Sequence, residues 1–588
     1  MAKVTPARRV ALNVLMEAEQ TGRYARELMP AAADAARLDA RDAAFAMRLA
    51  LGVTSTRGCL DDALDAHLDK PKKVAARVRM ALRIAAFEAL YLNTAPEVAV
   101  SQGVELVNSF AKGASGLANA VLRRVCACRD AFLSAEDAAP EQREMVARAR
   151  RAGLPVWLVR RVVESLGEDR AQEVLDAQCG AAPLAVHANP LRERELVRPL
   201  HDADALPLAL PGALSVAHVG PLVSSGSFAH ADAVASDYHA QLIAAAATRA
   251  GSCLEIGAGR GTKTFMMLAH VRRRQIEHAH VALDMYEGKC RANAVRIERA
   301  DLGGLELAVG DATDLDACLA EYDAHVCGCV AEGIGGRAEG HASGWTNGEG
   351  SVRVSGDTGG FASSNSSVRV SSGTSLFSGE RGGETSADRA VVPVDADFRE
   401  CALSDALAHG TARTCVPAGD DSHERALRDA VAHGTASAGA PADVDSRDRV
   451  LFDTVFVDAP CSGTGTMRRH GEIAWRLTPT ECKRELPDLQ LALLRAAARR
   501  VAEGGELIYA TCSVLRAENQ DVVQAFLSSE EGARFKLAPV SGLLEEAGAA
   551  YARAACEMAA LEDEHGCFQS VPAPGGYDGH FCARFILR

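Results

Sequence analysis

Two short segments place a thiol just after a predicted strand. The segment DAPCSGTGTMRRH brings Asp458 and Cys461 into a loop at the carboxyl end of one strand, and Arg468 and Arg469 follow as a basic pair that could meet phosphate. The segment ELIYATCS ends the next strand with Cys512. One cysteine at a strand end is usually a small buried apolar residue. Two of them on neighbouring strands could face a single pocket, beside a carboxylate.

A glycine-rich turn lies upstream, in LEIGAGRGTKT. Gly257, Gly259 and Gly261 would let the backbone approach a ligand closely, and the helix that follows would present its N-terminus. The spacing is G-x-G-x-G rather than the G-x-G-x-x-G of dinucleotide sites. The turn alone leaves a dinucleotide site, an S-adenosylmethionine site and a plain structural turn open.

Two aspartates follow the next two predicted strands. Asp284 ends VALDMY, where a carboxylate can accept hydrogen bonds from ribose hydroxyls. Asp311, in AVGDATD, could hold an adenine amino group. Either residue alone is more often a helix cap or a loop residue. Their regular succession after strand ends favours a nucleoside site.

Elements of two kinds must position these residues. From residue 253 onward, short apolar runs alternate with helical stretches, which predicts β-α units and a mainly parallel sheet. Upstream, apolar residues such as Val78, Leu82 and Ala85 recur at helical spacing. We predict three domains: an all-helical domain with a basic last helix (1–135), a mixed α/β connector (136–245) and an α/β domain (246–588).

The charge of the chain is unevenly distributed. A net charge of −14 is unfavourable for binding nucleic acid. Residues 1–150 nevertheless hold 22 Lys and Arg against 18 Asp and Glu, whereas residues 325–450 hold 11 against 18. The second region is rich in Gly and Ser in its first half, and it repeats ALSDALAHGTA as ALRDAVAHGTA. We predict that residues 325–450 form a flexible insertion in the α/β domain.

The composition argues against a membrane protein, a disulfide-bonded secreted protein and a zinc-knuckle protein. No apolar run approaches the roughly 20 residues that cross a bilayer, and no signal-peptide core is present, so we expect a cytoplasmic protein with no membrane partner. The 17 cysteines are odd in number and thinly spread, which favours reduced thiols. The pairs Cys126-x-Cys128 and Cys327-x-Cys329 are too closely spaced for zinc knuckles, so no metal is predicted.

The two cysteine segments resemble the motifs of RNA cytosine-C5 methyltransferases of the RsmB/Sun (Fmu) ribosomal RNA type. The run ANAVLRR (118–124) resembles the end of the NusB-like RNA-binding domain of that type, and DGHF (578–581) resembles the start of its final strand. The resemblance covers nearly the whole chain except 325–450. It implies an all-α NusB-like domain, followed after the connector by a class I (Rossmann-like) methyltransferase domain.

The resemblance also implies a mechanism. A thiolate adds to carbon 6 of cytosine, so that carbon 5 can attack the sulfonium methyl of S-adenosylmethionine; a base then takes the carbon-5 proton and the thiol leaves. Cys512 would be the nucleophile, Cys461 would help release the product, and Asp458 would hydrogen-bond the base. The implied cofactor-binding residues are Gly257, Ala258, Gly259, Arg260, Gly261, Thr262, Lys263, Asp284, Asp311 and Asp458.

The substrate implied is RNA, most specifically 16S ribosomal RNA, bound by a monomer. The target base must leave its stack to react, which favours single-stranded or loop RNA. The implied RNA-binding residues are Arg123, Arg124, Arg468 and Arg469. Two alternatives stay open within RNA biology: a tRNA cytosine-C5 methyltransferase and a catalytically silent assembly factor. A nicotinamide oxidoreductase is disfavoured by the glycine spacing and by the DAPCSG loop.

Three features depart from the family pattern. Its glycine loop usually reads Cys-Ala-Ala-Pro-Gly-Gly-Lys-Thr, whereas this chain has Gly257, Gly259, Arg260 and Thr262 in place of the Cys, the second Ala, the Pro and the second Gly. After the basic pair and histidine the family favours Pro-Asp, where this chain has Gly-Glu (471–472). The insertion lies between Asp311 and Asp458, beside the predicted active face.

Overall fold

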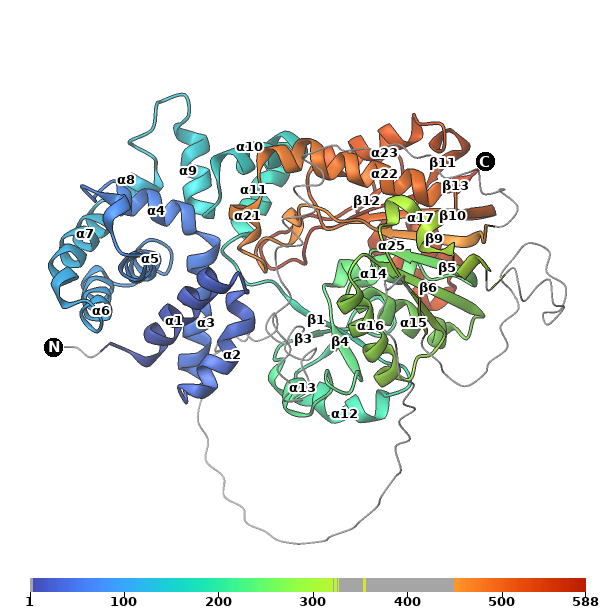
Figure 1. Cartoon of the computed structure of the whole chain (residues 1–588), viewed down its shortest axis with the longest axis horizontal. Helices are drawn as coiled ribbons and strands as arrows, with labels where there is room; N and C mark the ends of the chain where they lie inside the picture. The colour runs from blue at the N-terminus through green and yellow to red at the C-terminus, as the bar shows by residue number, and fades with distance from the viewer. Residues whose placement is uncertain (1–3, 321, 325, 327–352, 356–448) are drawn as a thin grey trace, which may run out of the picture.

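The computed structural model describes residues 4–320, 322–324, 326, 353–355 and 449–588 (Figure 1). The predicted insertion at 325–450, with its repeats, therefore lies almost wholly outside the described residues. None of the described helices combines the length and apolar character that spanning a bilayer requires. The described cysteines are all free thiols.

The N-terminal part is entirely helical, and it forms the left-hand body in Figure 1. Its central helix, α5, is buried along nearly its whole length, and the predicted apolar stripe of Val78, Leu82 and Ala85 lies in this core. Asp39 caps α3 by accepting from the backbone N–H of Asp42. The helices are α1 (Pro6–Thr21), α2 (Ala25–Ala35), α3 (Ala40–Ser55), α4 (Arg57–Asp65), α5 (Ala76–Leu90), α6 (Pro96–Asn108), α7 (Ser115–Ala127) and α8 (Arg129–Leu133).

The connecting part mixes helices with a small antiparallel sheet in the order β2-β3-β1-β4. The three helices that come first pack against the loops of the large domain, because their apolar faces share a core with Met467, Ala474 and Val514. The elements are α9 (Arg143–Ala152), α10 (Val156–Leu166), α11 (Glu168–Ala177), β1 (Leu184–Ala188), α12 (Glu193–Asp202), β2 (Leu206–Pro207), β3 (Ala213–Val216), α13 (Gly220–Ser224) and β4 (Ala233–Ala235).

The C-terminal part is built on a large twisted sheet in the order β11-β13-β10-β9-β5-β6-β7-β8. Strands from β10 to β8 run parallel, and β13 inserts antiparallel between β10 and β11. The strands are β5 (Gly251–Ile256), β6 (His278–Asp284), β7 (Leu305–Val309), β8 (Arg353–Ser355), β9 (Phe452–Asp458), β10 (Val501–Thr511), β11 (Phe535–Ala538), β12 (Phe568–Gln569) and β13 (Phe581–Leu587). This order confirms the predicted α/β domain.

Helices cover both faces of this sheet, so alternate strand residues enter two different cores. Cys253 and Phe456 pack with α14 (Tyr238–Ala246), α15 (Thr262–Arg274), α16 (Glu287–Ala300), α24 (Ser541–Glu546) and α25 (Ala552–Ala559). Leu254 and Val455 pack with α17 (Leu315–Cys318), α22 (Leu486–Ala498) and α23 (Gln520–Leu527). After β5 the chain passes to β6 and β7 on one side and then returns to β9 on the other. Ligands of open α/β sheets bind at such a reversal, beyond the carboxyl ends of the strands.

The helical body docks directly on the segment that follows the first cysteine loop. Trp475, on the short helix α21 (Ile473–Arg476), donates its indole N–H to the carbonyl of Ser55 over 2.6 Å. Its ring lies so close to Gly58 that a Cβ there would be 1.9 Å from it. Arg26 pairs with Glu472 at 3.3 Å. A cavity of about 420 Å³ lies beside this contact, lined by the first helices and α21.

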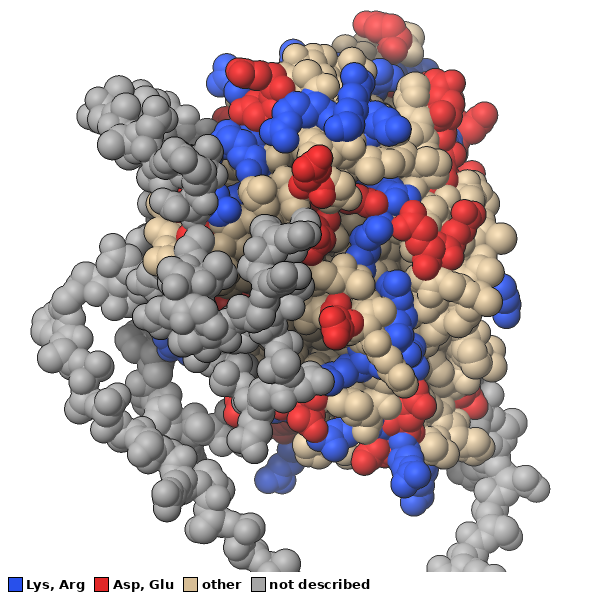
Figure 2. Space-filling model, turned by 90° about the vertical axis from the view of Figure 1, so that its right-hand side faces the viewer, with Lys and Arg blue, Asp and Glu red and all other residues tan. Residues whose placement is uncertain are grey.

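Charged side chains of both signs share the surface of the large domain. Figure 2 shows the face at the right of Figure 1, where Lys and Arg side chains run down the middle with Asp and Glu on both flanks. Arg123 and Arg124 lie far from this face, exposed on α7 at the left-hand end of the molecule.

Candidate active site

The carboxyl ends of β9 and β10 bring the two cysteines together. The sulfur atoms of Cys461 and Cys512 are 3.1 Å apart, and the backbone N–H of Cys512 points at the sulfur of Cys461 over 3.3 Å. Both residues are partly exposed. Their hydrogen bond, together with burial, raises the pKa of Cys461 well above its usual value. Cys461 therefore keeps its proton, and it can donate that proton to the neighbouring sulfur.

A buried carboxylate ties the two cysteine loops to each other. Glu518 accepts from the backbone N–H of Ser462 (2.8 Å) in one loop and from the hydroxyl of Ser513 (2.7 Å) in the other. Gln490, on α22, donates to the same carboxylate over 3.0 Å. Burial raises the pKa of Glu518, although these donors oppose the rise. Because each cysteine precedes one of the two serines, Glu518 fixes the spacing of the sulfurs.

Glycine backbone interlocks three separate segments at the same place. Gly465 donates its N–H to the carbonyl of Cys512, and Gly579 donates to the carbonyl of Gly465, both over 2.9 Å. A Cβ at position 465 would lie 2.0 Å from the carbonyl oxygen of Gly579. Only glycine fits there. The DGHF segment thus closes directly onto both cysteine loops.

An ion pair stands beside the thiols. Lys263, at the start of α15, contacts the carboxylate of Asp458 over 2.7 Å. Burial favours the neutral form of the amine, but Asp458 and then Cys512 outweigh it and raise the pKa of Lys263. Burial raises the pKa of Asp458, and Lys263 opposes that rise. The site therefore holds a cation within the electrostatic reach of Cys512.

The glycine turn joins β5 to α15 with positive φ angles at Gly257, Gly259 and Gly261 (81°, 57° and 80°). A Cβ at position 257 would lie 2.2 Å from the carbonyl oxygen of Asp458, so this glycine allows the ends of β5 and β9 to meet. Asp284 accepts from the backbone N–H of Gly259 over 3.0 Å. The turn, the N-terminus of α15 and a strand-end carboxylate thus lie together.

Asp311 is more exposed than Asp284. It follows β7, is exposed, and accepts from the backbone N–H of Thr313 over 3.0 Å, as a cap of the next turn. The structure therefore brings Asp311 to the same edge of the sheet but gives its carboxylate a local partner.

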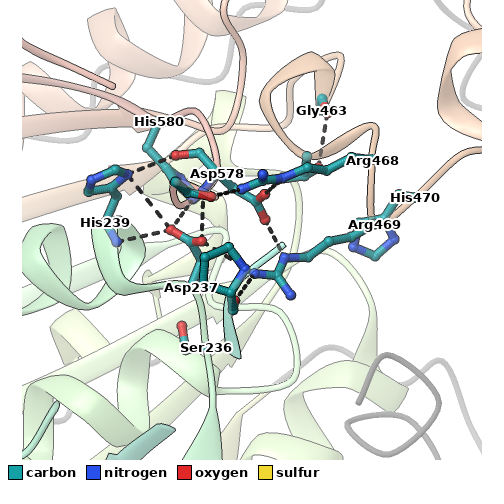
Figure 3. A network of polar contacts seen from close by, with 12 residues as sticks. Ser236, Asp237, His239, Gly463, Arg468, Arg469, His470, Asp578 and His580 are labelled. Atoms are coloured by element: carbon teal, nitrogen blue, oxygen red, sulfur yellow. Dashed lines mark hydrogen bonds and ion pairs between the residues drawn. The ribbon is translucent and has the colours of Figure 1, made fainter. Parts of the chain in front are cut away.

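The basic pair after the first cysteine faces inward (Figure 3). Arg468, whose side chain is only 1% exposed, donates to Asp578 over 2.7 Å. Arg469 donates to the other oxygen of Asp578 over 2.6 Å and to the carbonyl of Pro183, and it lies 3.6 Å from Asp237. Both side chains are thus held by acidic partners within the protein, and contact of Arg468 or Arg469 with RNA phosphate stays a prediction.

Comparison with known proteins shows what this arrangement resembles. Residues 5–127 match the model of the NusB family, and residues 424–586 match a family model described as 16S rRNA methyltransferase RsmB/F. The helical part of the chain thus matches the NusB family, and its C-terminal part matches the RsmB/F-type methyltransferases. Both domains were predicted from the sequence, and both predictions are confirmed.

The curated relatives carry a single function in their names. "Ribosomal RNA small subunit methyltransferase B" of Thermus thermophilus is 47% identical over 74 residues, which cover 13% of this chain and 18% of the relative. The protein of the same name from Sodalis glossinidius is 38% identical over 132 residues, covering 22% of this chain and 25% of the relative. The matches thus span a quarter or less of the length of these two relatives.

A solved structure shares the fold along the whole chain. The crystal structure of PH0851 covers 99% of this chain and 99% of its own, with a TM-score of 0.60 and 15% identity. This likeness bears on the fold alone.

Sequence reasoning missed the residues that support the methyltransferase domain's thiols. Neither Glu518 nor Asp237 belongs to a motif that predicts a site residue, yet both hold the loops in place. Asp237 is the N-cap of α14, and its side chain accepts from the backbone N–H of His239 and that of Asp578. An aspartate just before a helix is a readable cap signal, but its second partner lies 341 residues further along the chain.

Proposed function

We propose that this protein, acting as a monomer, methylates carbon 5 of a cytosine in small-subunit ribosomal RNA. The observation that carries the proposal is the pair of sulfurs 3.1 Å apart, beside the Lys263–Asp458 ion pair, at the strand-order reversal of a class I sheet. The names of the curated relatives support a ribosomal RNA substrate.

The residues around the glycine turn fit S-adenosylmethionine. The turn has the close-approach backbone that a nucleoside-bearing ligand needs, and the N-terminus of α15 opens beside it. Gly257 to Lys263, Asp284 and Asp311 would hold the cofactor, which when bound supplies an electrophilic methyl group. The four substitutions relative to the family loop leave three glycines with positive φ, so this loop keeps the conformational freedom that a close approach needs.

Cys512 is the nucleophile in this proposal. Its sulfur adds to carbon 6 of the cytosine, and the ring's electron pair moves to carbon 5, which becomes nucleophilic. Lys263 holds an ammonium group within electrostatic reach of Cys512, where a positive charge can stabilise the sulfur anion that forms and leaves during the reaction. Asp458 would hydrogen-bond the edge of the base, held in place by Lys263.

Cys461 completes the cycle. After carbon 5 gains the methyl group and loses its proton to a base, the carbon 6–sulfur bond breaks and Cys512 leaves as a thiolate. The raised pKa of Cys461 keeps a proton 3.1 Å from that sulfur, where it can stabilise the departing anion. Removing Cys461 should therefore trap the covalent adduct.

The helical domain would bind the RNA in a way tolerant of sequence. Arg123 and Arg124 are exposed on α7 and can reach phosphate. Arg468 and Arg469, both paired with Asp578, would in addition hold the Cys461 loop.

Adduct trapping tests the mechanism. Cys461→Ala, incubated with a small-subunit ribosomal RNA transcript and S-adenosylmethionine, should accumulate a protein–RNA band that survives denaturing gels. Cys512→Ala should form none, and Cys556→Ala, a substitution of an exposed cysteine outside the site, should behave as wild type. Adduct formation by Cys512→Ala would rule out the assigned nucleophile.

The alternatives make different predictions. A tRNA methyltransferase would label tRNA in preference to the ribosomal transcript when both are offered together. A silent assembly factor would show no heat of binding with S-adenosylmethionine in calorimetry. Bisulfite mapping of the ribosomal RNA, with and without the protein, identifies the modified cytosine.

A further inference from the structure

A cluster of two histidines and a cysteine lies at the ends of β5 and β6 remote from the glycine turn. In the strand register Cys253 pairs with His280, and Gly251 pairs with His278. Alternate residues of a strand share a face, so His278, His280 and Cys253 point to the same side of the sheet. One ligand atom from each of the three lies within 4.8 Å of the others.

The outer nitrogen of each imidazole has an oxygen partner. Nδ1 of His278 lies 2.7 Å from the carbonyl oxygen of Arg249, and Nε2 of His280 lies 2.9 Å from Oε2 of Glu255. A carbonyl only accepts, so Nδ1 of His278 carries a hydrogen. Oε2 of Glu255 already accepts from the hydroxyl of Thr264 over 2.6 Å. An ionised Glu255 only accepts, and with this carboxylate as its partner Nε2 of His280 is a donor as well.

The inner nitrogens then face each other with lone pairs. Nε2 of His278 and Nδ1 of His280 are 3.0 Å apart. Two lone pairs cannot approach so closely unless a cation lies between them or beside them. Either a third proton or a metal ion supplies that charge, and the sulfur of Cys253 is the third donor of the group.

We propose that Cys253, His278 and His280 bind a divalent metal ion of the zinc class. Zinc prefers sulfur and imidazole nitrogen, with about 2.0–2.1 Å to nitrogen and about 2.3 Å to sulfur, so tetrahedral ligand atoms lie about 3.3–3.6 Å apart. The two nitrogens, 3.0 Å apart, would need to separate slightly, and the sulfur, within 4.8 Å of both, would need to move closer by about 1 Å. The Arg249 carbonyl and Glu255 act as the outer partners that orient metal-binding imidazoles.

The metal would have a structural role and is independent of the proposed methylation. It would fasten the first residues of β5 to those of β6, whose opposite ends carry the glycine turn and Asp284. Burial raises the pKa of the Cys253 thiol well above its usual value, so binding must release its proton. Affinity should therefore increase with pH. His278, the partly exposed member, gives a route of entry.

The sequence did not show this site. His278 and His280 form a recognisable His-x-His, but Cys253 lies 25 residues upstream of His278, outside any metal-knuckle spacing. Only the parallel pairing of β5 with β6 brings the three together.

Metal content measured by mass spectrometry tests the proposal on the full chain. Protein incubated with Zn²⁺ and then dialysed should retain one ion more per chain than the Cys253→Ser and His278→Gln variants. Co²⁺ should give tetrahedral visible bands and a thiolate charge-transfer band that both variants lose. Cys290→Ser, which alters another buried cysteine of the same domain, should keep the ion. The Cys327→Ser/Cys329→Ser double variant should also keep it.

The His278→Gln variant should unfold cooperatively and keep the circular dichroism spectrum of the wild type. A loss of metal in this variant then reflects the loss of a ligand and not the loss of the fold. Chelation should lower the melting temperature of the wild type but not that of either ligand variant. Equal metal content in wild type and Cys253→Ser overturns the proposal. Wild-type protein that retains no ion also overturns it. In that case the charge between the two imidazoles is supplied by a proton.

Discussion

At the scale of single residues, the chemistry depends on charges placed beside sulfur. Lys263 contacts Asp458 and interacts with Cys512, so one cation serves both the carboxylate and the proposed nucleophile. The hydrogen bond to Cys512 and burial raise the pKa of Cys461, and Glu518 adds to that rise. The two thiols are therefore unequal before any substrate arrives.

Replacing Lys263 by methionine tests this inequality. The variant lacks the cation that lies within electrostatic reach of Cys512, so alkylation of Cys512 by iodoacetamide at pH 7 should slow by about tenfold. Peptide mass spectrometry follows the labelling of Cys512 alone. Lys536→Met, which removes an exposed lysine from β11, should leave the rate unchanged. Equal rates in all three proteins would show that Lys263 does not act on the thiol.

Replacing Glu518 tests the link between the loops. Glu518→Ala leaves the backbone N–H of Ser462 and the side chain of Gln490 without their buried acceptor. The free energy of unfolding should fall by about 2–4 kcal/mol in urea titrations. Glu518→Gln can still accept one of these bonds and should lose about half as much. A larger loss in the glutamine variant would contradict the assigned role.

At the scale of elements, the loops fit only because one position lacks a side chain. Gly465→Ala would push its Cβ into the carbonyl oxygens of Gly579 and Cys512, both of them backbone atoms that cannot rotate away. The variant should lose about 1–3 kcal/mol of stability and nearly all adduct formation. Gly116→Ala, at a helical position with open space around it, is the matched control and should retain both. Normal trapping by Gly465→Ala would show that the loops can separate without cost.

Local patterns in the sequence were sufficient to predict where the glycine turn and the two cysteine loops lie. The glycine turn and the cysteine loops each follow a strand within a few residues, and parallel strands bring their carboxyl ends to one edge. The inward direction of Arg468 was not predictable, because its partner Asp578 lies 110 residues away. A basic pair near an expected RNA site looks the same in sequence whether it faces phosphate or a buried carboxylate. An aspartate after a strand is often a cap of the following turn, and Asp311 makes this contact with the backbone N–H of Thr313.

At the scale of the whole molecule, the helical domain and the first cysteine loop share an interface. Gly58→Leu should displace Trp475 and separate the two bodies, because no space exists for a side chain at position 58. Small-angle scattering should then report a larger radius of gyration. RNA methylation should fall while S-adenosylmethionine binding persists, because the glycine turn is remote from this contact. Unchanged scattering and activity would mean that the interface is dispensable. Gly113→Leu, in open space, is the control.

The free energy of unfolding should also depend on pH, because several histidines are buried. Burial lowers the pKa of His187 and of His580 to about 3, and it lowers the pKa of His270 well below its usual value. These residues are neutral when folded but take up protons near pH 6.5 when unfolded. The contribution of these neutral histidines to the stability of the folded state is therefore complete above about pH 6.5. It is lost as the pH falls toward 3, because the unfolded chain then binds more protons than the folded one. Each contributes a slope of up to about 1.4 kcal/mol per pH unit.

Urea titrations at pH 7, 6 and 5 measure this slope. The unfolding midpoint should fall steadily with acidification in the wild type and less steeply in His187→Gln. His201→Gln, which alters a histidine whose side chain is 86% exposed, should follow the wild type. A midpoint that is independent of pH would refute the assignment of neutral buried histidines.

The contact of Gly579 with Gly465 has a consequence for synthesis. A ribosome makes the loop that holds Cys461 more than a hundred residues before it makes the DGHF segment that closes over it. A nascent chain that already carries both thiols is therefore unable to complete the pocket until β13 has emerged. The enzyme we propose would gain its reactivity only after this segment has been made, and a stalled or truncated product lacking residue 579 would carry the sulfur pair without its closing segment.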